Sequence, residues 1–151
     1  LTNTFGIDPS LLVYVPFLLQ PLTNEDQLQW PPYADRQGFL SIGNFRHAPN
    51  WDQVLCLKTQ IWPAIRRCMP HATLSVFGAY APQKAMQLHS PKDGFLVLGR
   101  AEDAKEVMRQ ARVLLAPLRF GAGLKGKLIE AMQCGTPSVT TSIGAEGMLG
   151  A

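Results

Sequence analysis

The chain has 151 residues, which suits one domain of ordinary size, and its composition of 46% hydrophobic and 17% charged residues argues against disorder. The net charge is +3 and the basic residues are scattered, without a run of Lys and Arg, so we expect no nucleic-acid partner. Three cysteines without CxxC spacing favour free thiols in a reducing compartment, and we therefore expect a cytoplasmic protein.

The first 37 residues are predicted to form an N-terminal segment, or interdomain connection, that carries one strand. Their apolar run spans residues 11–19 and is interrupted by Pro16, well short of the ~18 apolar residues that cross a bilayer. We therefore expect no transmembrane segment. A polar stretch with several prolines follows, and this composition is typical of a linker.

Regular alternation of strands and helices is predicted from residue 38 onward. Short apolar runs that end at glycine or another small residue predict strands at 38–43, 72–78, 94–99, 112–116 and 137–141. Apolar spacing of three to four predicts helices at 50–70, 82–88, 102–111 and 124–134. Asn50 is expected to cap the first helix with Gln53 as its capping-box partner, and Pro63 is expected to bend that helix.

The order of these elements predicts the fold class. Strand–helix–strand repetition with short connections gives right-handed crossovers and a parallel sheet. The strands lack alternation of polar and apolar residues, as expected for strands covered on both faces. We therefore predict an α/β fold, a Rossmann-like parallel sheet flanked by helices, with its ligand beyond the carboxyl ends of the strands.

Residues 117–130, PLRFGAGLKGKLIE, carry the pattern that bears most directly on function. A glycine loop leads into a helix, whose first turn offers unpaired N–H groups and a positive dipole end to a phosphate. Lys125 and Lys127 stand at that junction, and Glu130 follows one turn later. The combination predicts a site for an anionic ligand that also carries hydroxyls, and a nucleotide sugar has both features.

Each of these residues also has a purely structural interpretation. The lysines could form a solvated helix end, the glycines a plain turn, and Glu130 a surface partner of Lys127. The segment also satisfies most of a P-loop pattern, from Gly121 to Lys127. Leu128 follows, however, where a P-loop needs Ser or Thr to bind magnesium, so we do not expect an ATPase site.

Four blocks of this sequence resemble GT-B glycosyltransferases of family 4, the glycosyl transferases group 1. The blocks are FLSIGNFRHAPNWD, LSVFG, LVLGRAEDA and LLAPLRFGAGLKGKLIEAMQCGTPSVTTSIGAEG, and the resemblance covers residues 38–151. The last block is the most specific, because many of its positions agree with the family in one order. The resemblance implies the C-terminal half of a GT-B fold, in which two Rossmann-like domains face a cleft.

The resemblance also implies a function for residues 38–151. They would be the domain that binds a nucleoside diphosphate sugar, truncated at its C-terminus, in a retaining glycosyltransferase. The acceptor would bind to a missing N-terminal domain, through which peripheral membrane association stays open. No metal and no cofactor beyond the donor substrate are expected, and this half alone is expected to be inactive.

The family implies roles for particular residues. Lys127 is expected to contact the donor diphosphate and Glu130 the ribose hydroxyls, and both are assigned to catalysis. Further donor contacts are expected from the residues that line the cleft, namely Gly43, Arg46, Arg100, Gly121, Gly123, Leu124, Lys125 and Glu146. Arg46 would reach the diphosphate or else pair with Asp52.

One position departs from the family pattern. Members often carry two glutamates eight positions apart, the first beside the donor sugar and the second at the ribose. Glu130 matches the second, whereas Ala122 stands in place of the first. The missing first glutamate keeps open a non-catalytic nucleotide-sugar-binding module. A sugar-nucleotide epimerase or hydrolase of the same fold is a further alternative.

Overall fold

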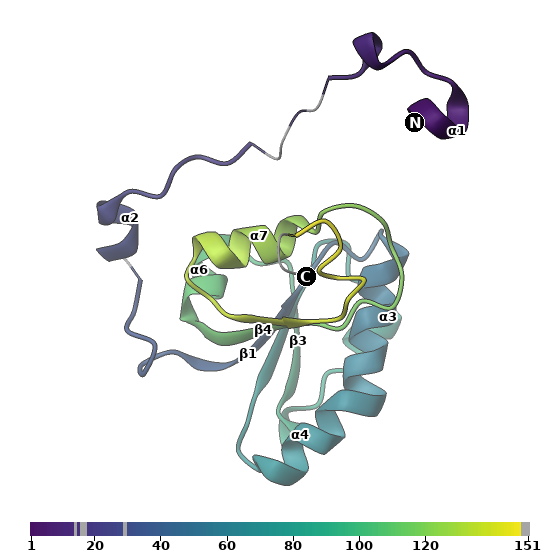
Figure 1. The fold of residues 1–151 in the computed structure, drawn as a ribbon. Helices are drawn as coiled ribbons and strands as arrows, with labels where there is room; N and C mark the ends of the chain where they lie inside the picture. The colour runs from purple at the N-terminus through teal and green to yellow at the C-terminus, as the bar shows by residue number, and fades with distance from the viewer. Residues whose placement is uncertain (14, 16–17, 29, 149–151) are drawn as a thin grey trace.

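The computed structural model describes residues 1–13, 15, 18–28 and 30–148, and a five-stranded parallel sheet forms its centre (Figure 1). The strands lie in the order β3-β2-β1-β4-β5. Their bounds are β1 Gln37–Ile42, β2 Leu74–Phe77, β3 Phe95–Gly99, β4 Ala111–Ala116 and β5 Ser138–Thr140. The α/β fold predicted from the sequence, a parallel sheet flanked by helices, is confirmed.

Helices cover both faces of the sheet, and each face has its own core (Figure 1). On one face lie α3 (Ala48–Cys56), η2 (Leu57–Ile61), α4 (Trp62–Cys68) and the short α5 (Gln83–Met86). Trp62 fills this core, where its ring meets Phe39 and Phe95 edge to face. On the other face lie α6 (Ala104–Gln110) and α7 (Gly126–Gln133), which pack Met108 and Leu128 against the sheet. A short turn of helix, η3 (Pro91–Asp93), precedes β3.

The strand order determines where a ligand can bind. The chain moves outward from β1 through β2 to β3, then returns to the other side of β1 for β4 and β5. Connections on the two sides of β1 therefore leave the sheet on opposite faces, and a crevice opens beyond the carboxyl ends of the strands near this reversal.

The first helix begins earlier than the sequence predicted, and Asn50 does not cap it. Helix α3 starts at Ala48, with His47 at the N-cap position and Pro49 in the first turn, where proline is favoured. Asn50 instead lies inside the helix and donates from Nδ2 to the carbonyl of Asn44, 2.8 Å away. Gln53 is buried and also makes no capping bond.

The helical run continues through Pro63 by way of a π-turn. Proline removes one backbone donor, and the preceding segment η2 has π-helical geometry, with the Trp62 N–H bonded to the Leu57 carbonyl. The bend expected at Pro63 is thus accommodated by a local widening of the helix just before it.

The described part of residues 1–36, here called the N-terminal arm, contains three short helical turns. These are α1 (Thr2–Phe5), η1 (Pro9–Leu11) and α2 (Asn24–Leu28). The described residues of the apolar run 11–19 form no strand, and residues 14, 16 and 17 of that run lie outside the described residues. Figure 1 shows the beginning of the arm well away from the sheet, where the side chains of Leu11 and Leu18 are exposed.

A buried arginine attaches the end of the arm to the α/β domain. Arg36 is only 4% exposed, and its guanidinium donates to the carbonyls of Pro31 at 3.1 Å and Gly135 at 2.7 Å. It also reaches the Thr136 hydroxyl at 3.3 Å. In the part of the chain that the structure describes, no helix has both the length and the apolar character to cross a bilayer.

Candidate functional site

A cleft of about 340 Å³ opens at the carboxyl ends of the strands, which is the edge that the sequence predicted. A volume above about 300 Å³ is typical of small-molecule sites. The cleft is bounded by the loops after β1, β2 and β3 and by the facing sides of α6 and α7, with lining residues Ile42, Gly43, Asn44, Gly78, Ala79, Arg100, Ala101, Glu102, Ala104, Met108, Lys127 and Glu130. Four of the predicted site residues therefore meet here, namely Gly43, Arg100, Lys127 and Glu130.

Lys127 supplies a half-buried positive charge to this cleft. Its ammonium donates to Asn50 Oδ1 at 2.6 Å and to Gln53 Oε1 at 3.2 Å. Burial lowers the pKa of Lys127 from its usual 10.5 to about 8, because removal from water penalises the charged form. The group therefore stays protonated at neutral pH, and it lies in the first turn of α7, where unpaired N–H groups add to the positive potential.

Glu130 lies one turn further along α7 and borders the same cleft. Residues three apart share one face of a helix, so the side chains of Lys127 and Glu130 border the same cleft. Among the described residues, no hydrogen bond or ion pair involves the Glu130 carboxylate. The surface pair between Lys127 and Glu130 considered from the sequence is thus absent from the described residues, and Glu130 can accept from ligand hydroxyls.

Lys125 is engaged within the glycine loop itself. Its ammonium donates to the carbonyls of Gly121 and Gly123, and it lies 3.7 Å from Glu146. Its side chain is 11% exposed. These contacts fold the side chain back over the loop that precedes α7. Lys125 therefore fastens the loop to the Glu146 segment, and its charge is balanced within the protein.

The rest of the glycine loop borders a second, more open hollow of about 370 Å³. Gly121 and Glu146 line it together with Arg119, Phe120, Ser142 and Ile143. Gly121 and Gly123 have positive φ angles of 116° and 75°, which L side chains rarely adopt. Leu124 is 40% exposed and lies against Gly147. The residues of the glycine loop that were predicted to contact the nucleotide sugar therefore form a group separate from the residues around Lys127.

Arg46 does not line the main cleft. Its guanidinium lies 3.6 Å from the centre of the Tyr80 ring in a cation–π contact. The alternative partner Asp52 is also taken, because its carboxylate forms a bidentate ion pair with Arg119. Arg46 and Tyr80 thus stack outside the residues that line the cleft, and Tyr80 is held there with a φ of +57°.

The glycines after β1 and β2 are required by packing between protein groups. A Cβ atom on Gly43 would lie 2.6 Å from the Asn50 side chain. A Cβ on Gly78 would lie 2.3 Å from the Gly43 carbonyl and 2.4 Å from the Phe45 ring. Gly43 therefore does line the cleft as predicted, and it also leaves the space that Asn50 occupies.

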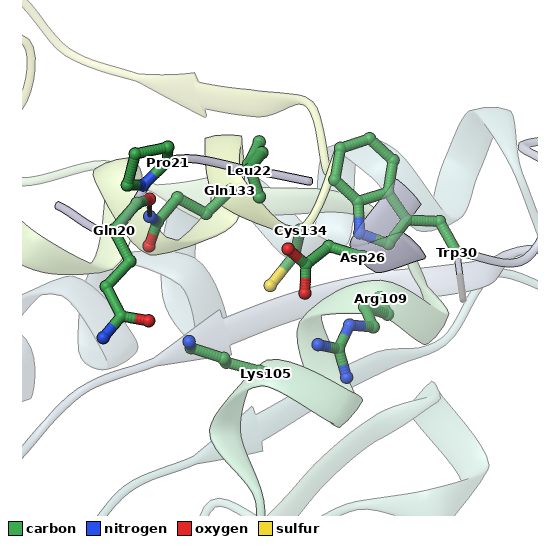
Figure 2. Close-up of a pocket in the computed structure, with 9 residues that line it drawn as sticks. All are labelled: Gln20, Pro21, Leu22, Asp26, Trp30, Lys105, Arg109, Gln133 and Cys134. Carbon is green, nitrogen blue, oxygen red and sulfur yellow. Dashed lines mark hydrogen bonds between the residues drawn. The ribbon is translucent and has the colours of Figure 1, made fainter. Parts of the chain in front are cut away.

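A further hollow beside the N-terminal arm is too small to hold a nucleotide. It measures about 60 Å³ and lies between the arm, α6 and the end of α7. Figure 2 shows Lys105 and Arg109 of α6 on the side of the hollow that faces Asp26 of the arm, with the Gln133 amide bonded to the Gln20 carbonyl at 3.2 Å. Hydrogen bonds from Thr23 hold the pKa of Asp26 below its usual value, and the two cations lower it slightly further. The hollow thus lies at the contact between the arm and the α/β domain.

Sequence reasoning missed Asn50 and Gln53 as partners of Lys127. Both were interpreted as capping residues, and the contacts that they make span 77 and 74 positions of the chain. The polar residue Glu102 also borders the cleft and was not assigned. Among the described residues, no group of three or more His, Cys, Asp or Glu side chains could hold a metal ion.

Comparisons with known proteins identify a family and a fold. Residues 36–150 match the model of a family described as "Glycosyl transferases group 1". Among solved structures, the chain is similar to WaaG, described as a glycosyltransferase involved in lipopolysaccharide biosynthesis, at 20% identity with a TM-score of 0.61. The alignment covers 94% of this chain and 41% of the WaaG chain, so this chain spans less than half of that protein. Among curated protein sequences, none matches.

Proposed function

Because the chain belongs to the glycosyl transferases group 1 family, we propose that it is the donor-binding half of a retaining glycosyltransferase. The complete protein would transfer a sugar from a nucleoside diphosphate to an acceptor bound by a further domain. The observation that carries this proposal is that the half-buried ammonium of Lys127 and the carboxylate of Glu130 both border the cleft from one face of α7. We also propose a cytoplasmic location, which fits the three free cysteines.

The role of Lys127 follows from the charge that develops during transfer. When the bond between sugar and diphosphate breaks, negative charge builds on the departing phosphate oxygens. An ammonium already in place can stabilise that charge without reorganisation, and its effect is larger in a site with little water. The N–H groups at the start of α7 add a second source of positive potential.

Glu130 would orient the nucleoside. A carboxylate has two oxygens that only accept, and adjacent ribose hydroxyls are two donors at matching spacing. Holding the ribose fixes the position of the diphosphate relative to Lys127, which favours transfer by orientation. Gly43 and Gly78 allow the loops after the first two strands to lie close together.

The open hollow beside Gly121 and Glu146 is where we place the donor sugar. It adjoins the glycine loop, and Arg119 and Ser142 offer polar groups there. Ala122 supplies no carboxylate to this region, so the sugar would be held by a contact set different from that of the two-glutamate members. We propose that the anomeric configuration is retained because the chain belongs to this family. NMR of the glycosylated product would measure that configuration.

Calorimetric titration of this chain with uridine and guanosine diphosphates tests the proposal. We expect weak binding of at least one nucleotide and its loss in Lys127→Ala. Lys92→Ala is the matched control, because Lys92 lies in η3 before β3 and outside the residues that line the cleft. Absence of binding at millimolar concentration, or equal binding by both variants, would contradict the proposal. Sugar transfer by the protein with its acceptor domain separates an enzyme from a non-catalytic binding module.

A further inference from the structure

Lys127 is a half-buried cation that forms no ion pair within the described part of the chain. Buried charges are normally paired with an opposite charge, because an isolated ion loses its hydration without compensation. The four ion pairs of the described residues are Lys58–Asp93, Arg109–Glu106, Arg119–Asp52 and Lys125–Glu146. Lys127 is in none of them, and neither is the more deeply buried Arg36, whose guanidinium donates to two carbonyls and a hydroxyl. The half-buried Lys127 differs from Arg36 in that its ammonium also borders a cleft.

Two neutral amides hold the ammonium, and the contacts fix which way each amide faces. An ammonium only donates, so the oxygens of Asn50 and Gln53 must face it. The amide nitrogens then point the other way, where each finds an acceptor. Asn50 Nδ2 donates to the Asn44 carbonyl at 2.8 Å, and Gln53 Nε2 donates to the Ser41 hydroxyl at 2.6 Å.

The contacts form a continuous buried path from the sheet to the cleft. Ser41 lies in β1 and is fully buried, Gln53 lies in α3 and is 1% exposed, and Lys127 lies in α7. Elements on both faces of the sheet are therefore joined at one ammonium. Two of its three N–H donors are used by Asn50 and Gln53, which leaves the third for a ligand in the cleft.

We propose that Asn50 and Gln53 are positioning residues, which hold the Lys127 ammonium through neutral oxygens so that its full charge remains available to a phosphate group of the donor. A carboxylate at either position would fix the ammonium equally well but would cancel its charge. The ligand named here rests on the proposed function. The positioning itself concerns only this chain's residues and can be measured without a ligand.

The experiment compares two substitutions of nearly the same shape as the native residues, Gln53→Glu and Asn50→Asp. Each turns a neutral oxygen partner of Lys127 into an anion. Gln60→Glu is the control, since it adds the same charge to an exposed position of the adjoining segment η2. The pKa of Lys127 is followed by NMR of the side-chain Cε resonance, and the affinities for uridine diphosphate and for inorganic pyrophosphate are measured by calorimetry.

We expect both carboxylate variants to raise the pKa of Lys127 by one unit or more and to weaken binding of both anions at least tenfold. Gln53→Met, which removes the acceptor, should lower the pKa and also weaken binding. The carboxylate variants and Gln53→Met would then shift the pKa of Lys127 in opposite directions while both weaken anion binding. General damage to the fold would not produce this combination. Asn50→Asp gives the same test at a half-buried position if Gln53→Glu does not fold.

Two results would overturn the inference. An unchanged pKa of Lys127 in both carboxylate variants would show that these amides do not hold the ammonium. Unchanged anion affinity in those variants, with binding intact in the wild-type chain, would show that its free charge is not used. Failure of the wild-type chain to bind either anion would instead refute the proposed function and with it the named ligand, while the pKa measurement still decides the positioning.

Discussion

The lowered pKa of Lys127 leads to a quantitative prediction of how the free energy of unfolding changes with pH. Its pKa is about 8 in the folded chain and should return to about 10.5 on unfolding. Between these values the unfolded chain keeps the proton that the folded chain has lost. Unfolding then takes up a proton, so the free energy of unfolding rises with pH across this window. Below pH 8 Lys127 is protonated in both the folded and the unfolded chain, so the unfavourable burial of its charge lowers the free energy of unfolding by the full amount.

The size of the effect follows from the same two values. A pKa lowered from 10.5 to about 8 corresponds to roughly 3 kcal/mol, at about 1.4 kcal/mol for each pH unit. We expect the difference in unfolding free energy, wild type minus Lys127→Met, to grow by about this amount between pH 7.5 and 10.5. The difference removes contributions from other titrating groups, and it does not depend on how far the substitution itself destabilises the chain.

Urea denaturation of both proteins at half-unit pH steps measures this difference. Nucleotide affinity should change in the opposite sense, because binding uses the protonated ammonium, and it should fall about tenfold for each pH unit above 8. A stability difference that stays flat from pH 7.5 to 10.5 would refute the reasoning, since Lys127 would then titrate alike in the folded and unfolded chains.

Four further substitutions test other parts of the structure. Gly43→Ala should displace Asn50, 2.6 Å from the added Cβ, and weaken nucleotide binding several-fold by calorimetry while the NMR spectrum keeps its native dispersion. Glu130→Gln should weaken uridine diphosphate binding about tenfold, the order expected for charge-assisted hydrogen bonds, with pyrophosphate binding unchanged; equal losses for both ligands would argue against a ribose contact. Lys125→Met should speed amide exchange in the glycine loop yet reduce nucleotide affinity less than Lys127→Met, and a larger loss would make Lys125 a direct ligand. Arg36→Met should lower the free energy of unfolding by roughly 2–4 kcal/mol in urea, because three buried hydrogen bonds to its guanidinium are lost.

The sequence was sufficient for the architecture because the sheet is encoded locally. Five short apolar runs with small residues at their carboxyl ends became five parallel strands, and the largest shift of a predicted strand boundary was two residues. The edge that carries the cleft follows from the strand order alone. Lys127 and Glu130 were placed together because their spacing on one helix is itself a local property.

The environment of Lys127 could not be predicted, because it depends on how two helices from opposite faces meet at the sheet edge. Asn50 followed three residues later by Gln53 has the spacing of a capping box, and local rules favour that interpretation. Pro49 already occupies the first turn, however, so the helix begins before Asn50 and turns both amides toward α7. Arg46 was likewise assigned by its place after β1, whereas the Tyr80 ring, 34 positions away, decides where its guanidinium lies.

Helix α7 also connects two regions that the sequence keeps far apart. Its first turn carries Lys127 into the cleft, and its last residue, Gln133, is bonded to the arm at Gln20. The arm's Trp30 packs on Gly135 just beyond the helix, where Arg36 is also bonded. Eight helical residues span about 12 Å, so this rod is short and stiff. Loss of the Arg36 contacts in Arg36→Met should therefore be detected first at the carboxyl end of α7, as faster exchange of its backbone amides.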